Sequence, residues 1–238
     1  MIDIITYSDN YQQILKDFFF KPTYELFLKK DFNHIDIIEN TNIQNNECLG
    51  FGSDIFQHMI YKRWEILINH IENNLDDKKI SIFSDIDIVF FDSFKNDIDV
   101  LFSNDTFHIF FMPEIPFNHN TYDNSKINAG FFIFRHTLIT LNFFKFILEF
   151  MKKQKIKEDQ FYITQFLQKN RQDFVGLLDY NVFNTNNCNI NLNINLRNIK
   201  KLKVFHATSC ININEKIDVL FKITNNIHNQ ILSIYDKL

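Results

Sequence analysis

Two aspartates interrupt an apolar stretch of the chain, and their spacing suits the binding of a metal ion. Asp85 and Asp87 follow the apolar or small residues 80–83 and precede the apolar residues 88–91. Unpaired charge is costly to bury, so acids in such surroundings are usually paired or bound to a metal. Alternate residues of an extended chain point to the same side, so both carboxylates can bind one hard cation such as Mg²⁺ or Mn²⁺. Two acids on a solvent-facing turn are the alternative for so short a pattern.

Polar residues also stand beside two later elements of the chain. Gly130 opens the apolar run 130–134 and removes a side chain where the backbone can approach a ligand. Asn128 offers the donor and acceptor groups that suit a sugar hydroxyl, although a plain turn into a strand is the favoured explanation when this segment is taken alone. Asp159 and Gln160 open a helix, where they either face a sugar or simply favour the helix N-terminus.

A histidine and two cations complete the set of candidate groups. His206 ends a late strand, and neutral imidazole is a good ligand for Mn²⁺, so it could complete the coordination begun by the two acids. A structural histidine is the alternative. Lys62 and Arg63 lie within a predicted helix, where they either pair with a diphosphate or carboxylate or belong to a solvated face.

Strands and helices alternate along the chain and must bring these groups together. The hydrophobic pattern predicts strands at residues 2–7, 34–38, 79–83, 106–112, 130–134, 174–177 and 203–206. Helices are predicted at residues 11–20, 55–73, 138–152 and 158–169, and in the tail from residue 214. The alternation predicts an α/β fold with a mostly parallel sheet flanked by helices. Ligands bind beyond the carboxyl ends of the strands in such sheets, so residues just after strands are the first candidates.

Composition bounds the class of protein. The 238 residues are 45% hydrophobic, include 29 Phe and carry a net charge of −4, which suits one folded α/β domain without a basic surface for nucleic acid. The three cysteines are far apart and are expected to be reduced thiols. No apolar run approaches the ~20 residues of a membrane span, and no signal peptide is expected, so we predict a cytoplasmic protein. The Asn-rich residues 181–198 are expected to form a surface loop.

Five short motifs, taken in order, resemble the nucleotide-diphospho-sugar transferase family, typified by plant-type α-xylosyl- and arabinosyltransferases (glycosyltransferase family 77 and its relatives). They are Phe51-Gly52-Ser53 before a helix with Lys62, Phe83-Ser84-Asp85-Ile86-Asp87-Ile88-Val89-Phe90, Asn128-Ala129-Gly130-Phe131-Phe132, Glu158-Asp159-Gln160-Phe161 and Phe205-His206-Ala207. The resemblance spans roughly residues 1–210. It implies a GT-A, Rossmann-like domain over residues 1–212. The helical spacing of apolar residues predicts a tail over residues 213–238, which either packs on the domain or mediates a homodimer.

The resemblance also implies roles at the metal and nucleotide. Asp85 and Asp87 match the DxD motif, with Asp87 the more direct metal ligand and Asp85 nearer the ribose, and His206 matches the late metal-binding histidine. The helix that carries Lys62 is one of the matching segments, and we assign Lys62 to the donor. The first strand and turn are implied to line the base and ribose, with the residues Thr6, Tyr7, Ser8 and Asp9.

At the sugar, the resemblance places Asn128 and Gly130 beside the donor and sets Asp159 and Gln160 at the anomeric region. The chain departs from the family pattern at Ala129, where Thr or Ser is usual. It also lacks the Gly and nearby basic residue that often follow the late histidine and contact the diphosphate, and Lys216 is only a distant candidate.

The implied activity is a metal-dependent glycosyltransferase, either a hexosyl- or a pentosyltransferase. It would move a sugar from a nucleoside-diphosphate sugar, with UDP the implied nucleotide, to a hydroxyl of a glycan, glycoconjugate or protein. Mn²⁺ or Mg²⁺ would neutralise the leaving diphosphate. The resemblance implies retention at the anomeric carbon, but an acid at the position of Asp159 is the general base of inverting GT-A enzymes, so inversion stays open.

Two other classes fit part of the pattern. Asp85-Ile86-Asp87-Ile88-Val89 also has the form of the nucleophile motif of haloacid-dehalogenase-like phosphatases. Those proteins usually carry this motif on an early strand and a second acidic pair late in the chain, and neither holds here. A catalytically degenerate GT-A domain that only binds a nucleotide is the second alternative, motivated by the missing Gly after His206.

Overall fold

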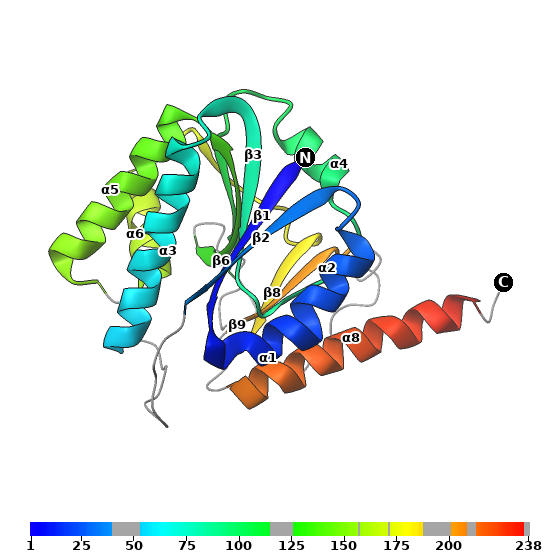
Figure 1. Cartoon of the computed structure of the whole chain (residues 1–238). Helices are drawn as coiled ribbons and strands as arrows, with labels where there is room; N and C mark the ends of the chain where they lie inside the picture. Colours follow the sequence, from blue (N-terminus) through cyan, green and yellow to red (C-terminus); the bar gives the residue numbers. More distant parts are fainter. Residues whose placement is uncertain are drawn as a thin grey trace.

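The computed structural model describes residues 1–39, 53–114, 126–156, 158–170, 172–187, 201–208 and 213–235. Its central sheet has the strand order β2-β1-β3-β6-β5-β7 (Figure 1). These strands are β1 (Ile2–Asp9), β2 (Phe32–Glu39), β3 (Asp76–Ser84), β5 (Ile109–Pro113), β6 (Ile127–His136) and β7 (Val175–Leu177). β1 is parallel to β2 and β3, and β5 is parallel to β7, whereas β6 runs antiparallel to both of its neighbours. The predicted α/β fold with a mostly parallel sheet is therefore confirmed.

Apolar residues on alternate positions bury both faces of this sheet. Ile5 and Phe83 pack in a core beneath α3 (Asp54–Glu72), α5 (Leu138–Gln154) and α6 (Asp159–Lys169). Ile4 and Ile82, each one residue earlier, pack in a second core with α2 (Lys21–Phe27) and α4 (Lys95–Leu101). This is the pattern expected of strands that are covered by helices on both sides.

Helix α3 is fixed in place by its cap and by one aromatic ring. The Ser53 hydroxyl accepts a hydrogen bond from the Phe56 backbone N–H at 3.1 Å, which starts the helix. The fully buried Trp64 stacks on Phe132 of β6, with ring centroids 5.7 Å apart. Its neighbour Arg63 contacts the sheet directly, with its guanidinium carbon over the Phe83 ring of β3, 4.8 Å from the ring centroid. Phe51 and Gly52, part of the first motif, and the three cysteines lie outside the described residues.

A second, smaller sheet brings the late histidine to the acidic motif. Its order is β4 (Ile88–Phe90), β9 (Val204–Thr208), β8 (Phe183–Asn187). β4 and β9 pair antiparallel with Ile88 opposite His206, and β8 pairs parallel with β9. The prediction of a surface loop over residues 181–198 is wrong for its first part, because Phe183 and Thr185 are buried in this strand. Residues 188–198 lie outside the described residues.

Short and long helical segments meet beside the small sheet. The helix predicted at residues 11–20 consists instead of three short segments of different pitch, η1 (Asn10–Gln12), α1 (Gln13–Leu15) and η2 (Lys16–Phe20). The tail forms α8 (Ile213–Tyr235), whose Leu220 and Ile223 are buried in a third cluster with Ile86 of the acidic motif and Phe205 of β9. Among the helices that the structure describes, none is long and apolar enough to span a membrane.

Candidate active site

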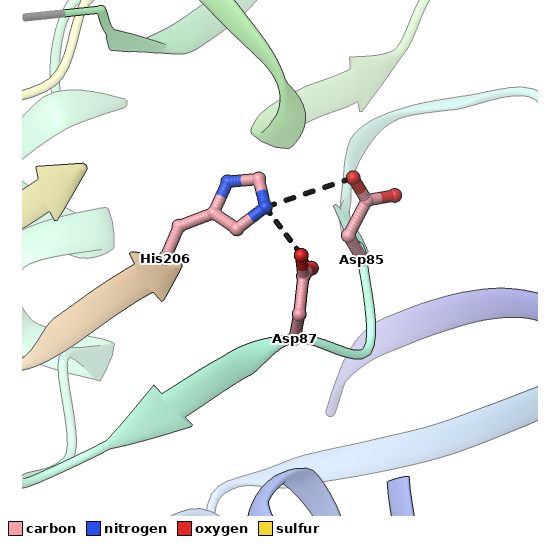
Figure 2. Close-up of side chains that lie close together, drawn as sticks. All are labelled: Asp85, Asp87 and His206. Carbon is pink, nitrogen blue, oxygen red and sulfur yellow. Dashed lines mark ion pairs between the residues drawn. The ribbon is translucent and has the colours of Figure 1, made fainter. Parts of the chain in front are cut away.

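Asp85, Asp87 and His206 come together at the carboxyl end of β3 (Figure 2). Each offers one ligand atom, and these atoms lie within 4.8 Å of one another. His206 Nε2 is 3.0 Å from Asp87 Oδ1 and 3.8 Å from Asp85 Oδ2. Asp87 and His206 are buried, whereas the Asp85 side chain remains about a third exposed. Two carboxylates and one imidazole form the oxygen and nitrogen donor set that suits Mn²⁺ or Mg²⁺.

Gly130 leaves the space in which two of these side chains lie. A Cβ added at Gly130 would lie 2.2 Å from His206 Cε1 and 2.4 Å from Asp85 Oδ2. The Gly130 carbonyl also accepts a hydrogen bond from the Asp85 backbone N–H at 2.7 Å. A side chain at this position would therefore displace candidate metal ligands, which explains the glycine physically.

Two cations neutralise part of the negative charge at this edge. Arg63 of α3 binds Asp159 of α6 through one terminal nitrogen, and its other terminal nitrogen lies 3.3 Å from Asp85 Oδ1. Lys216 of α8 forms an ion pair with Asp87. Three carboxylates thus face two full cations, which leaves one formal negative charge before His206 is counted. A divalent cation is attracted to such a cluster.

Burial and charge move the pKa values of these groups in defined directions. Partial burial raises the pKa of Asp85, against the opposing charge of Arg63. Burial also disfavours ionised Asp87, but the neighbouring Lys216 and His206 hold the pKa of Asp87 well below its usual range. For His206, burial disfavours the charged ring, but Asp87 outweighs it and raises the pKa. Of the two aspartates, Asp87 therefore stays ionised more readily than Asp85. The ionised carboxylate is the form that can bind a metal.

A network of amides and acids adjoins the cluster on β6. Asn128 Nδ2 donates to Glu114 Oε2 at 2.9 Å and to Gln160 Oε1 at 3.2 Å, while Asn128 Oδ1 lies 2.9 Å from His206 Nδ1. Gln160 Oε1 also accepts from the Ala129 backbone N–H at 3.2 Å. Burial raises the pKa of Glu114. The residues predicted to contact the sugar are thus linked directly to the candidate metal ligands.

Asp159 is held on three sides where α6 begins. Its Oδ2 accepts hydrogen bonds from Arg63 and, at 2.8 Å, from Trp64 Nε1. Its Oδ1 accepts the Gln160 backbone N–H at 2.8 Å. The carboxylate is buried, and these three donors fix its position.

The end of β1 lies at the same edge as the acidic motif, because Ile5 pairs with Phe83 in parallel register. Thr6 is buried and its hydroxyl donates to Asp36 Oδ1 at 3.1 Å, while the Tyr7 hydroxyl binds Glu39. Asp9 Oδ1 accepts the Gln12 backbone N–H at 3.0 Å.

Ser8 differs from its neighbours at the end of β1. Its hydroxyl is buried and has no hydrogen-bond partner within the described part of the chain. Buried polar groups are normally hydrogen-bonded, so an unpaired hydroxyl needs an explanation.

Lys62 does not join the cluster. Its side chain is about half exposed and lies 3.8 Å from Glu65 on the same helix. Successive residues of an α-helix point about 100° apart, so burial of the neighbouring Arg63 turns Lys62 outward. The cations at the site are instead Arg63, which was predicted together with Lys62 to pair with a diphosphate or carboxylate, and Lys216, which was only a distant candidate. Glu114 is an acid that sequence reasoning did not select.

Residues 21–220 of the 238 match the nucleotide-diphospho-sugar transferase family. The chain belongs to this family. The resemblance seen in five motifs is thereby confirmed, and the phosphatase alternative is not favoured. No curated protein sequence matches the chain.

Solved glycosyltransferase structures share the fold at low sequence identity. One, involved in glycosylation of the major capsid of PBCV-1, has a TM-score of 0.60 and 11% identity, covering 93% of this chain and all of that one. Mouse xyloside xylosyltransferase 1 has a TM-score of 0.54 and 8% identity, covering 89% and 99% of the two chains. The galactosyltransferase LgtC has a TM-score of 0.51 and 11% identity, covering 87% of each chain. The fold is therefore that of the GT-A glycosyltransferases.

Proposed function

We propose that this chain transfers a sugar from a nucleoside-diphosphate sugar, with UDP as the nucleotide, to a hydroxyl of a glycan, glycoconjugate or protein. A divalent cation, Mn²⁺ or Mg²⁺, is held by Asp85, Asp87 and His206. The observation that carries the proposal is the meeting of these three groups within 4.8 Å at the carboxyl edge of the sheet of a nucleotide-diphospho-sugar transferase. When bound there, the cation neutralises charge that develops on the leaving diphosphate.

The chain's own residues bind and orient the donor on either side of this cluster. Ser8, with its buried unpaired hydroxyl, supplies a hydrogen-bonding group for the nucleoside at the end of β1. Lys216 already lies at the cluster through its contact with Asp87, so its ammonium is the basic group for the diphosphate that the sequence pattern lacked near His206. Asp159 and Gln160 face the sugar, where negative and amide oxygens stabilise positive charge at the anomeric carbon.

We propose retention at the anomeric carbon, as the family resemblance implies. Arg63 and Trp64 donate hydrogen bonds to one oxygen of Asp159, and the Gln160 backbone N–H donates to the other. A general base needs a free lone pair to take a proton from the acceptor hydroxyl, and these three donors leave one of the carboxylate's roughly four lone-pair sites on Oδ1, so the configuration of the product decides between the two outcomes. ¹H NMR of the first-formed product tests this directly: the anomeric configuration of the donor sugar is kept, and an inverted product would refute retention.

Binding of UDP tests the donor assignment without knowledge of the sugar. Isothermal titration calorimetry is run on the whole chain with UDP, with and without Mn²⁺. We expect UDP to bind more tightly with Mn²⁺ than without it, because Asp85, Asp87 and His206 would hold the cation, which would offset the negative charge of the diphosphate. Equal affinity in the two titrations would contradict the metal-dependent donor site.

A further inference from the structure

Asn128 occupies the centre of a hydrogen-bond network that leaves it no free group. It is 3% exposed, and its Oδ1 faces both the Gly130 backbone N–H at 2.9 Å and His206 Nδ1 at 2.9 Å. Its Nδ2 donates to Glu114 and to Gln160. An amide group has two donor hydrogens and one oxygen with two lone pairs. All of them are used by partners within the protein.

The partners of Asn128 determine which way its amide points. A backbone N–H can only donate, so the atom that faces Gly130 must be the amide oxygen. The carboxylate of Glu114, on the other side, accepts from the amide nitrogen. Both ends of the network therefore agree on one orientation of Asn128.

This orientation decides where the ring proton of His206 lies. Because Nδ1 of His206 faces an oxygen that can only accept, Nδ1 must carry a proton. The other ring nitrogen, Nε2, faces Asp87 and Asp85, so it is the nitrogen that would offer its lone pair to a cation held with these carboxylates. A histidine that binds a metal commonly donates its second N–H to such a partner, which fixes its tautomer and its orientation.

We propose that Asn128 is a positioning residue for the metal site, which holds His206 as the Nδ1–H tautomer so that Nε2 is the ligand atom. Gly130 and Glu114 keep the amide of Asn128 from flipping. This inference rests on the metal part of the proposed function, and it gives Asn128 a role in addition to the predicted one beside the donor sugar.

Metal affinity is the first test, measured by calorimetry with Mn²⁺ alone on the full chain. Loss of a partner of this kind typically lowers metal affinity about 10- to 100-fold, and we expect that loss for Asn128→Ala. The matched control is Thr185→Val, which removes a buried hydrogen bond to the Pro113 carbonyl on the strand beside His206 but leaves the imidazole untouched. The proposal would be overturned if Asn128→Ala, like the control, bound Mn²⁺ with the affinity of the wild type.

The identity of the ligand nitrogen is the second test, and it needs no variant. ¹⁵N NMR of histidine-labelled wild-type protein with Zn²⁺, a diamagnetic ion that binds the same donor types, assigns each ring nitrogen of His206. We expect Nε2 to be bound and Nδ1 to be protonated. Coordination through Nδ1 would overturn the proposal. If wild-type protein bound neither Mn²⁺ nor Zn²⁺, the metal part of the proposed function would fail first, so the two failures are distinguishable.

Discussion

Arg63 is the residue on which the geometry of the acidic groups depends most. It is buried between Asp85 and Asp159, and removal of one partner of a buried ion pair typically costs about 3–5 kcal/mol because a charge is left unpaired. We therefore expect Arg63→Met to lower the free energy of unfolding by roughly that amount in urea denaturation. The control is Lys62→Met on the same helix, which removes an exposed cation and should change stability by less than about 0.5 kcal/mol. Equal effects of the two substitutions would show that Arg63 is not the buried partner described here.

At the scale of single residues, the sequence was most informative about the site where a residue stood among neighbours of a kind that rarely surround it. Asp85 and Asp87 stand out because carboxylates rarely lie between two apolar runs, and the structure brings them to His206 as a candidate metal site. Glu114 and Lys216 gave no such signal. Their contacts join residues far apart along the chain, such as Lys216 and Asp87, and only the folded structure reveals them.

Helix α8 brings one basic residue to the site, and its outward face offers a control. Lys216 is paired with Asp87, whereas Lys222 on the same helix is exposed. Hydrogen bonds to charged groups contribute about 1.5–3 kcal/mol, so Lys216→Met should weaken UDP binding in the presence of Mn²⁺ roughly tenfold or more. Lys222→Met should bind UDP as the wild type does. A Lys216→Met protein with unchanged UDP affinity would remove α8 from the donor site.

Strand β6 passes so close to the cluster that only glycine fits at one position. Gly130→Ala would push a methyl group against His206 and Asp85. Overpacking of this kind costs about 1–3 kcal/mol, and here the shift falls on candidate ligands, so we expect weaker Mn²⁺ binding by calorimetry together with a lower melting temperature. Mn²⁺ affinity equal to that of the wild type would show that Asp85 and His206 do not need their present positions.

At the scale of elements, long periodic segments were predicted well, whereas among the short ones β7 and β9 were predicted and β4, α4 and β8 were missed. The helices α3, α5 and α6 have enough turns for their apolar spacing to be recognised. Strand β6 contains the continuous apolar run 130–134, and β3 ends in the apolar or small residues 80–83. β4 and α4 were not separated from their surroundings, because three to seven residues are too few to show a period. β8 was not predicted because its asparagines suggested a surface loop. Its place in the sheet depends on pairing with β9 and on burial of Phe183.

The whole molecule should lose stability in mild acid, in part because of a histidine far from the acidic motif. His136 is buried, its Nε2 is 2.8 Å from Ser81 Oγ, and its Nδ1 is 3.0 Å from the Asn74 carbonyl oxygen. Burial lowers the pKa of His136 from 6.5 to about 4. The unfolded chain therefore binds this proton more readily than the folded chain. The stability contributed by neutral His136 is present above pH 6.5 and is lost as the pH falls toward 4.

The measurement compares urea denaturation of the wild type and His136→Gln between about pH 4 and pH 7.5. The variant cannot take up this proton, so its free energy of unfolding should fall less steeply over that interval, whatever its stability at neutral pH. Parallel pH profiles for the two proteins would contradict a depressed pKa at His136.

The central claim is that the cluster of Asp85, Asp87 and His206 serves metal-dependent sugar transfer. Its most direct test incubates the wild type with a panel of nucleotide sugars and Mn²⁺ and measures release of the nucleoside diphosphate. We predict that the wild type releases nucleoside diphosphate from at least one donor and that removal of the metal abolishes this release. In Asp87→Asn the rate of release should fall by roughly a hundredfold or more. Absence of turnover with every donor, or equal turnover by Asp87→Asn, would contradict the account.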